Sequence, residues 1–201
     1  MASIANTAFE PKVTNIQRNN TQNIAGTFGA VSDGTFTGAI CPSGFLTVQS
    51  ALTVNSGYTG ILNGNTWQMV AATNGNSGAA GDHTGIYAFN SYDVPKALNN
   101  NGNSWNVGGT TLGLELPANE LGTFTEIIIG EQYKFGVGNF STAPTSGSKY
   151  ATIANGQLVA AATLTAGSGV AFEILRPEGF TLGARYGFDG YVLRALRAPA
   201  S

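Results

Sequence analysis

The stretch Tyr150-Ala-Thr-Ile-Ala-Asn-Gly-Gln-Leu-Val-Ala160 alternates apolar and polar residues on both sides of a central Asn-Gly. Alternation with a period of two is typical of a β-strand that buries one face. Asn-Gly tolerates positive φ at both turn positions, and it therefore favours a two-residue type I′ turn. The stretch predicts a strand, a tight turn at Asn155-Gly156 and a second strand paired antiparallel to the first.

The same signals extend outward from this hairpin. Strand character continues in the segments 111–116, 124–129, 133–137, 170–175 and 190–196, and residues 45–54 alternate as well. Turn dipeptides stand at Asp33-Gly34, Asn63-Gly64 and Asp189-Gly190. No strand–helix alternation accompanies these strands, which argues against a parallel α/β sheet. The chain is predicted to be all-β, an antiparallel β-sandwich or small β-barrel with long Gly/Asn-rich loops and an extended N-terminal arm.

The domain organisation follows from the change in composition along the chain. Residues 1–25 are polar with sparse apolar positions, which predicts an extended arm or a frayed terminus. As an arm it would lie on a neighbouring subunit, with Phe9, Val13 and Ile16 as anchors. Residues 26–201 form a single β-rich domain. Residues 73–110 are a loop-rich insertion, with a short helix expected at 94–99.

Charge is scarce, and this limits the functions that the chain can perform. Only 10% of its residues are charged, against about 25% in a typical domain, and the net charge is −2. A nucleic-acid binder needs a basic surface to displace counterions, so no nucleic-acid partner is expected. A polar but uncharged surface suits contacts with copies of the chain or with a large partner.

Catalytic motifs are missing from the sequence. His83 is the single histidine, and no serine stands in a nucleophile-elbow sequence, so His83 is interpreted as a loop residue of no special role. Glu115, Glu120, Glu126 and Glu131 could pair as in glycosidases, but their spacing is unspecific and favours a solvated surface. One histidine and one cysteine cannot make a usual zinc site. We expect no enzyme activity, metal or cofactor, and a buried, inert thiol at Cys41.

Aromatic residues offer the best candidates for contacts. Tyr87, Phe89, Tyr92 and Trp105 lie in sequence that is typical of loops and form either a satellite core or a contact surface. Trp67 alternates with Met69 in a predicted strand and is interpreted as a core residue. The start of the chain has no basic region followed by an apolar run, and no stretch approaches the length of a membrane span. The chain is therefore expected to be assembled in a cytoplasm, with no membrane partner.

The segments Tyr150–Val159, Gly169–Leu175 and Gly190–Arg194 resemble the β-rich proteins that decorate or cement the heads of tailed bacteriophages. The resemblance implies a non-enzymatic virion protein that binds the outer surface of a capsid and stabilises it. Its partner would be the major capsid protein, and it would act as a homo-oligomer, commonly a trimer.

Two other functions stay open beside this one. The first is a carbohydrate-binding or adhesin-type β module of a phage tail or fibre, with Tyr87, Tyr92 and Trp105 stacking on sugars. The second is a hydrolase that uses the glutamates.

Overall fold

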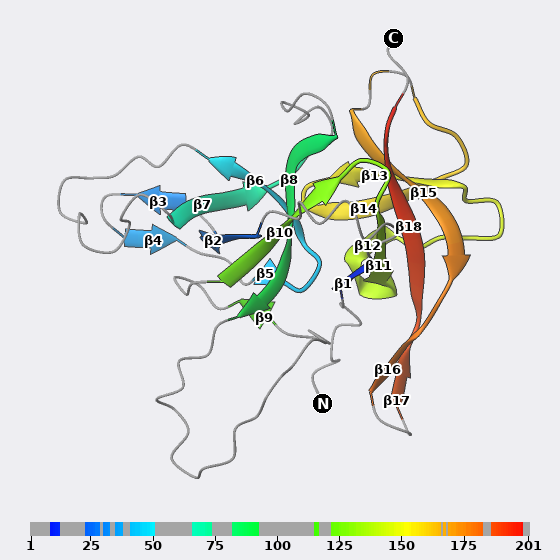
Figure 1. Cartoon of the computed structure of the whole chain (residues 1–201), viewed down its shortest axis with the longest axis horizontal. Coiled ribbons are helices and arrows are strands. Elements are labelled where there is room, and N and C mark those ends of the chain that lie inside the picture. Colours follow the sequence, from blue (N-terminus) through cyan, green and yellow to red (C-terminus); the bar gives the residue numbers. More distant parts are fainter. Residues whose placement is uncertain are drawn as a thin grey trace.

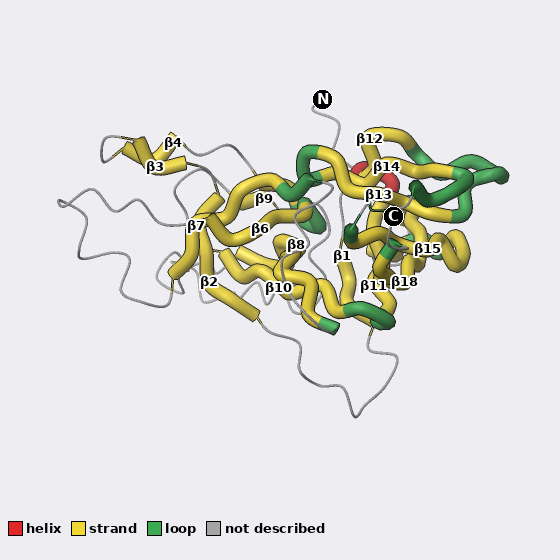
Figure 2. The backbone as a smooth tube through the Cα atoms, turned by 90° about the horizontal axis from the view of Figure 1, so that it is seen from above, coloured by secondary structure: helices red, strands yellow, loops and turns green. Residues whose placement is uncertain are grey.

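The structure is a computed structural model of the chain (Figure 1). It describes residues 9–12, 23–28, 30–32, 35–37, 41–50, 66–73, 82–92, 115–116, 122–165, 167, 169–182 and 186–198. Most of these residues lie in β-strands and none lies in an α-helix, which confirms the predicted all-β class. The strands form two bodies, a seven-stranded sheet and a closed five-stranded barrel, which lie side by side in both views (Figures 1 and 2).

The seven-stranded sheet is built mainly from the C-terminal part of the chain. Its strands, in spatial order, are β1 (Phe9–Lys12), β11 (Gln132–Gly136), β18 (Gly190–Arg197), β15 (Val170–Pro177), β13 (Tyr150–Ala154), β14 (Gln157–Ala161) and β12 (Phe140–Thr142). All neighbours are antiparallel except β12 and β14, which run parallel. The strands predicted at 133–137, 170–175 and 190–196 are therefore confirmed in type and position.

The barrel closes through five strands. They are, in order, β10 (Gly122–Ile128), β2 (Asn23–Phe28), β7 (Thr66–Ala71), β6 (Leu46–Ser50) and β8 (His83–Tyr92). β2 and β7 run parallel and the other pairs are antiparallel. The remaining elements are the pairs β3 (Ala30–Ser32) with β4 (Thr35–Thr37), β5 (Cys41–Pro42) with β9 (Glu115–Leu116), and β16 (Phe180–Leu182) with β17 (Tyr186–Phe188), and the 3₁₀ turn η2 (Val137–Asn139).

Two apolar cores stabilise the fold. One core spans the barrel and the sheet, because Leu46 and Ile86 of the barrel belong to the same buried cluster as Phe135 and Phe172 of the sheet. The second core includes Phe28, Met69, Tyr87, Phe89, Phe124 and, from the short β5–β9 pair, Cys41 and Leu116. Cys41 is free and fully buried, which confirms the predicted burial; the inertness of the thiol stays a prediction. Burial raises the pKa of Cys41 far above its usual range.

The hairpin predicted around Asn155-Gly156 is present. Ala154 pairs with Gln157, and both turn residues have positive φ, 47° at Asn155 and 78° at Gly156. The turn also joins the two bodies, because the Gly156 N–H donates to Ala72 O at 2.7 Å and the Leu46 N–H donates to Gly156 O at 2.9 Å. The Asn155-Gly156 turn, which the local sequence favours, therefore lies at the junction of sheet and barrel.

Other turn predictions have mixed outcomes. β3 and β4 flank Asp33-Gly34 and pair with Ser32 opposite Thr35, which confirms that hairpin. Asp189-Gly190 is not a hairpin turn, because β17 pairs with β16 while β18 runs between β11 and β15. Gly190 is required for close packing instead: a Cβ there would lie 2.8 Å from the Phe180 ring. The hairpin expected at Asn63-Gly64 and the helix at 94–99 lie outside the described residues.

The predicted domain limits need revision. Residues 9–12 of the expected arm form β1, an edge strand of this chain's own sheet, and the boundary at 25/26 falls inside β2. Within the expected loop-rich insertion at 73–110, where one or two short strands were predicted, β8 is a ten-residue strand of the barrel. The described elements include no helix long and apolar enough to cross a membrane.

Candidate functional site

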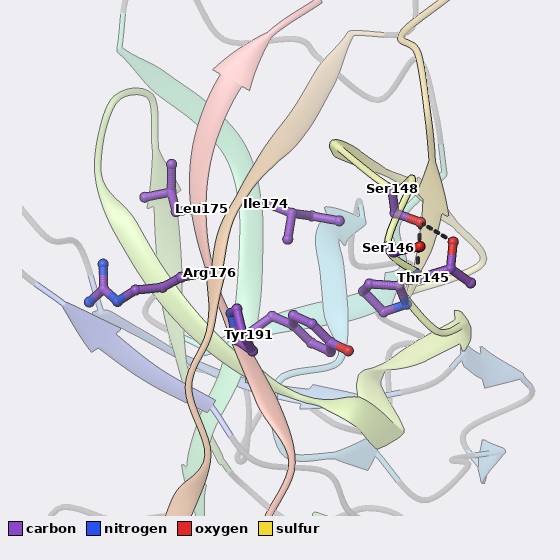
Figure 3. A pocket seen from close by; sticks show the side chains of 9 residues that line it. Thr145, Ser146, Ser148, Ile174, Leu175, Arg176 and Tyr191 are labelled. Atoms are coloured by element: carbon purple, nitrogen blue, oxygen red, sulfur yellow. Dashed lines mark hydrogen bonds between the residues drawn. The ribbon is translucent and has the colours of Figure 1, made fainter.

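A groove of about 360 Å³ opens on the seven-stranded sheet (Figure 3). It exists because β13 and β15 pair only at Tyr150–Glu173 and Ala151–Phe172, while β15 continues to Pro177. Beyond that point the end of β15 has β18 on one side and the groove on the other. Its lining is Pro144, Thr145, Ser146, Ser148, Ile174, Leu175, Arg176, Pro177 and Tyr191.

One wall of the groove is a hydroxyl-bearing turn. The Ser148 N–H donates to Thr145 O, and the Thr145 N–H donates to Ser148 Oγ, both at 3.0 Å. The hydroxyls of Thr145 and Ser148 lie 3.3 Å apart. Because these bonds are made within one turn, the hydroxyls keep a fixed arrangement while the turn itself stays exposed.

The opposite wall is apolar and aromatic. Figure 3 shows Tyr191 and Ile174 directed toward the hydroxyl-bearing turn, whereas Leu175 and Arg176 point to the other side of β15. The Tyr191 ring is held by an edge-to-face contact with Phe140, with centroids 5.7 Å apart. The Arg176 guanidinium is engaged by Glu178, at 2.9 Å between Nη2 and Oε2. The described lining contains no carboxyl, imidazole or thiol, so this groove offers stacking and hydrogen bonding rather than acid–base chemistry.

A second cluster of polar groups lies at the start of β8. His83 Nδ1 is 2.9 Å from Glu126 Oε2, and the other carboxylate oxygen accepts the Gly85 N–H at 3.1 Å. The Glu126 side chain is 3% exposed and the His83 side chain 44%. The strands are irregular here, with a register shift between Glu126 and Ile128 and a positive φ of 66° at Gly85. The imidazole was expected in a loop and the carboxylate on a solvated surface, and both expectations are wrong.

A histidine held by a carboxylate is the arrangement of a general base, but its neighbours here are structural. The nearby Thr84 hydroxyl is fully buried and bonded to Ile127 O and the Ile86 N–H. Arg197 of β18 donates to His83 O at 3.0 Å, so the cluster joins the barrel to the sheet. Across the described residues no group of three acidic, His or Cys side chains could hold a metal ion. We interpret the His83–Glu126 pair as a structural contact that stabilises the irregular pairing between β8 and β10.

The Glu126 carboxylate also affects a neighbouring phenol. Burial, and then the charge of Glu126, raise the pKa of Tyr87 above its ordinary value. Tyr87 is 6% exposed and belongs to the core within the barrel. Of the two interpretations of the aromatic group, the satellite core is therefore correct for Tyr87, and a contact surface is wrong.

Among the remaining predicted contact residues, Phe9 has a described side chain. Phe9 is 2% exposed and packs in the core of its own chain's sheet. Tyr92 is the last residue of β8. Val13, Ile16 and Trp105 lie outside the described residues. Trp67, expected in the core, is 38% exposed. No signal in the alternation separates it from Met69, which has the same parity and is fully buried.

Comparison with family models gives no match, and comparison with curated proteins gives none either.

Proposed function

We propose that the chain is a non-enzymatic structural virion protein that binds the outer surface of a phage capsid and stabilises it. The observation that carries this proposal is where the few charges lie. Glu10, Lys134 and Glu178 form one network, with Lys134 Nζ 3.4 Å from Glu10 and 3.6 Å from Glu178. Arg194 pairs with Glu173 across β18 and β15.

In these pairs opposite charges offset one another, which limits the net charge that a partner would meet there. The cores of protein interfaces are depleted in charged residues, while tryptophan is enriched at the positions that contribute most to binding. The exposed Trp67 on β7 is thus the best candidate for an anchor on the shell. Individual contacts of this kind are weak, but a subunit that repeats over a symmetric shell gains strong attachment when several contacts form together.

The test is co-sedimentation of the purified chain with empty shells made from the major capsid protein of the same genome. We expect saturable binding that persists in about 1 M NaCl, because a neutral interface is little affected by screening. Trp67→Ala should lower occupancy at an unchanged unfolding midpoint, and Arg194→Ala is the matched surface control that should bind as well as the native chain. Absence of the protein from the shells at every concentration would refute the proposal.

The groove favours a second candidate, a carbohydrate-binding β module. Sugar recognition combines an aromatic face with fixed hydrogen-bonding groups, and the groove sets Tyr191 against the hydroxyls of Thr145 and Ser148. Binding to a glycan array that is lost with Ser148→Ala, at an unchanged unfolding midpoint, would support this function. Ser141→Ala, on the edge strand β12 outside the groove, is the control and should bind like the native chain. An array without any signal for the native chain would exclude the carbohydrate-binding function.

A further inference from the structure

We propose that β1 is an exchangeable strand, and that the site it fills on β11 also accepts β1 from a second copy of this chain. This interaction surface differs from the capsid contact proposed above, and it can exist whether or not the chain binds a shell. The site is called the β1 slot here; it is formed by Gly44, Tyr133, Lys134 and Phe135.

The slot is formed entirely by elements far from β1 in the sequence. The Phe9 ring stacks on Tyr133 with centroids 5.9 Å apart and tilts against Phe135 at 5.1 Å. Gly44 closes the slot, since a Cβ at that position would lie 3.1 Å from Phe9 Cβ. The Phe9 side chain is thereby almost fully removed from water, at 2% exposure. Apolar burial of this size is the main contribution to the docking of the strand.

Charge and register make the slot selective. The Glu10 carboxylate lies 3.4 Å from Lys134 Nζ, and Lys134 is only 7% exposed. The same ammonium lies over the Phe180 ring at 4.2 Å. Four residue pairs fix the register, from Phe9 opposite Phe135 to Lys12 opposite Gln132. The slot therefore recognises a short strand in which an aromatic residue is followed by a carboxylate, and β1 supplies that pattern.

Topology allows the strand to come from another copy. β11 is already paired with β18 on its other side, so the sheet is complete without its edge strand. Glu10 and Lys134 are 124 positions apart, so no short turn ties β1 to the slot of its own chain. The ten residues 13–22 between β1 and β2 span at most about 36 Å. A slot of a neighbouring copy within that reach offers every contact that β1 makes in its own chain. Exchange therefore has a small free-energy cost when copies are held close together.

Disulfide trapping between two full-length, differently tagged copies tests the exchange. One copy carries Glu10→Cys and the other Lys134→Cys; these residues are opposed in an antiparallel pair, a separation that suits a disulfide. The native Cys41 is buried and has a raised pKa, so it stays unreactive. We expect a covalent heterodimer after the two copies are refolded together and oxidised, with a yield that rises between about 1 and 100 µM protein.

Two controls separate exchange from random collision. A single chain with both cysteines should form an internal disulfide and no dimer at about 1 µM, since the local concentration within one chain dominates there. Adding Phe9→Ala to the Glu10→Cys copy should lower the heterodimer yield at least ~tenfold, because the deleted ring is the buried anchor. Heterodimer absent at all concentrations, a yield insensitive to Phe9→Ala, or no internal disulfide in the double-cysteine chain would each overturn the proposal. The result of capsid co-sedimentation does not depend on any of these three disulfide-trapping outcomes.

Discussion

Gly156→Ala should destabilise the whole protein, although it adds a single methyl group. The residue has a φ of 78°, where an L-residue with a Cβ costs roughly 1–2 kcal/mol. The new Cβ would also lie 2.1 Å from Cζ of Phe45, whose ring is held edge-on by Phe28 at 5.3 Å. Ordinary contact begins at 3.4 Å, so the ring must retreat by roughly 1.3 Å, and overpacking of this kind costs about 1–3 kcal/mol.

The expected loss is therefore about 2–5 kcal/mol of unfolding free energy. For a chain of this length it corresponds to a fall in Tm of roughly 4–20 °C, measured by circular dichroism and checked by urea unfolding. Gly147→Ala is the matched control, because a Cβ at Gly147 meets nothing within 4 Å. A Tm for Gly156→Ala within about 2 °C of both the native chain and Gly147→Ala would refute the argument from close packing.

Three further changes test the buried polar groups and the surface pairs. Tyr133→Phe should lower stability by about 1–3 kcal/mol in urea unfolding, since the Ile128 N–H loses the hydroxyl that it donates to at 2.8 Å. Burial raises the pKa of Tyr133, so this phenol ionises in the unfolded chain at a lower pH than in the folded chain. The native chain should therefore lose stability as the pH rises past about 10, and Tyr133→Phe should lack the share of this loss that Tyr133 causes. Cys41 should react with a thiol reagent more than about tenfold slower in the folded than in the urea-unfolded chain, and equal rates would contradict its burial. Arg194→Ala should change stability by no more than about 1 kcal/mol, because the side chains of Arg194 and Glu173 are 49% and 34% exposed.

Local chemistry made part of the fold predictable. The Asn155-Gly156 hairpin was predicted because two adjacent residues that accept positive φ determine the turn. The strands β10, β11, β15 and β18 were predicted because short apolar runs stand between turn signals, although β10 and β11 are buried almost continuously rather than at alternate positions. The dipeptide Asp189-Gly190 shows the limit of this logic, because Gly190 meets packing demands from Phe180 and from two backbone carbonyls that only the assembled fold creates.

The site was less predictable because its contacts join distant parts of the chain. His83 and Glu126 are 43 positions apart, and only the antiparallel pairing of β8 with β10 brings them together. The barrel closes through the parallel pair of β2 and β7, which no turn signal marks. Trp67 and Met69 have the same parity, yet their exposures are 38% and 0%, so alternation alone cannot separate them. Their difference depends on how neighbouring elements cover each end of β7.

The placement of the few charges connects the fold to the proposed role. Glu10 and Lys134 join the first strand to β11, and Glu178 extends that network toward β16. His83, Glu126 and Arg197 join β8, β10 and β18, where the barrel meets the sheet. Each of these groups spans elements remote in sequence, and buried or half-buried pairs of this kind favour one register over the alternatives. Because only 10% of the residues are charged and these described groups pair between strands of the chain itself, few charges are left for contacts with a partner. The proposed attachment to a shell or to another copy would therefore depend on shape, on apolar anchors such as Trp67 and on added strands, which high salt leaves intact.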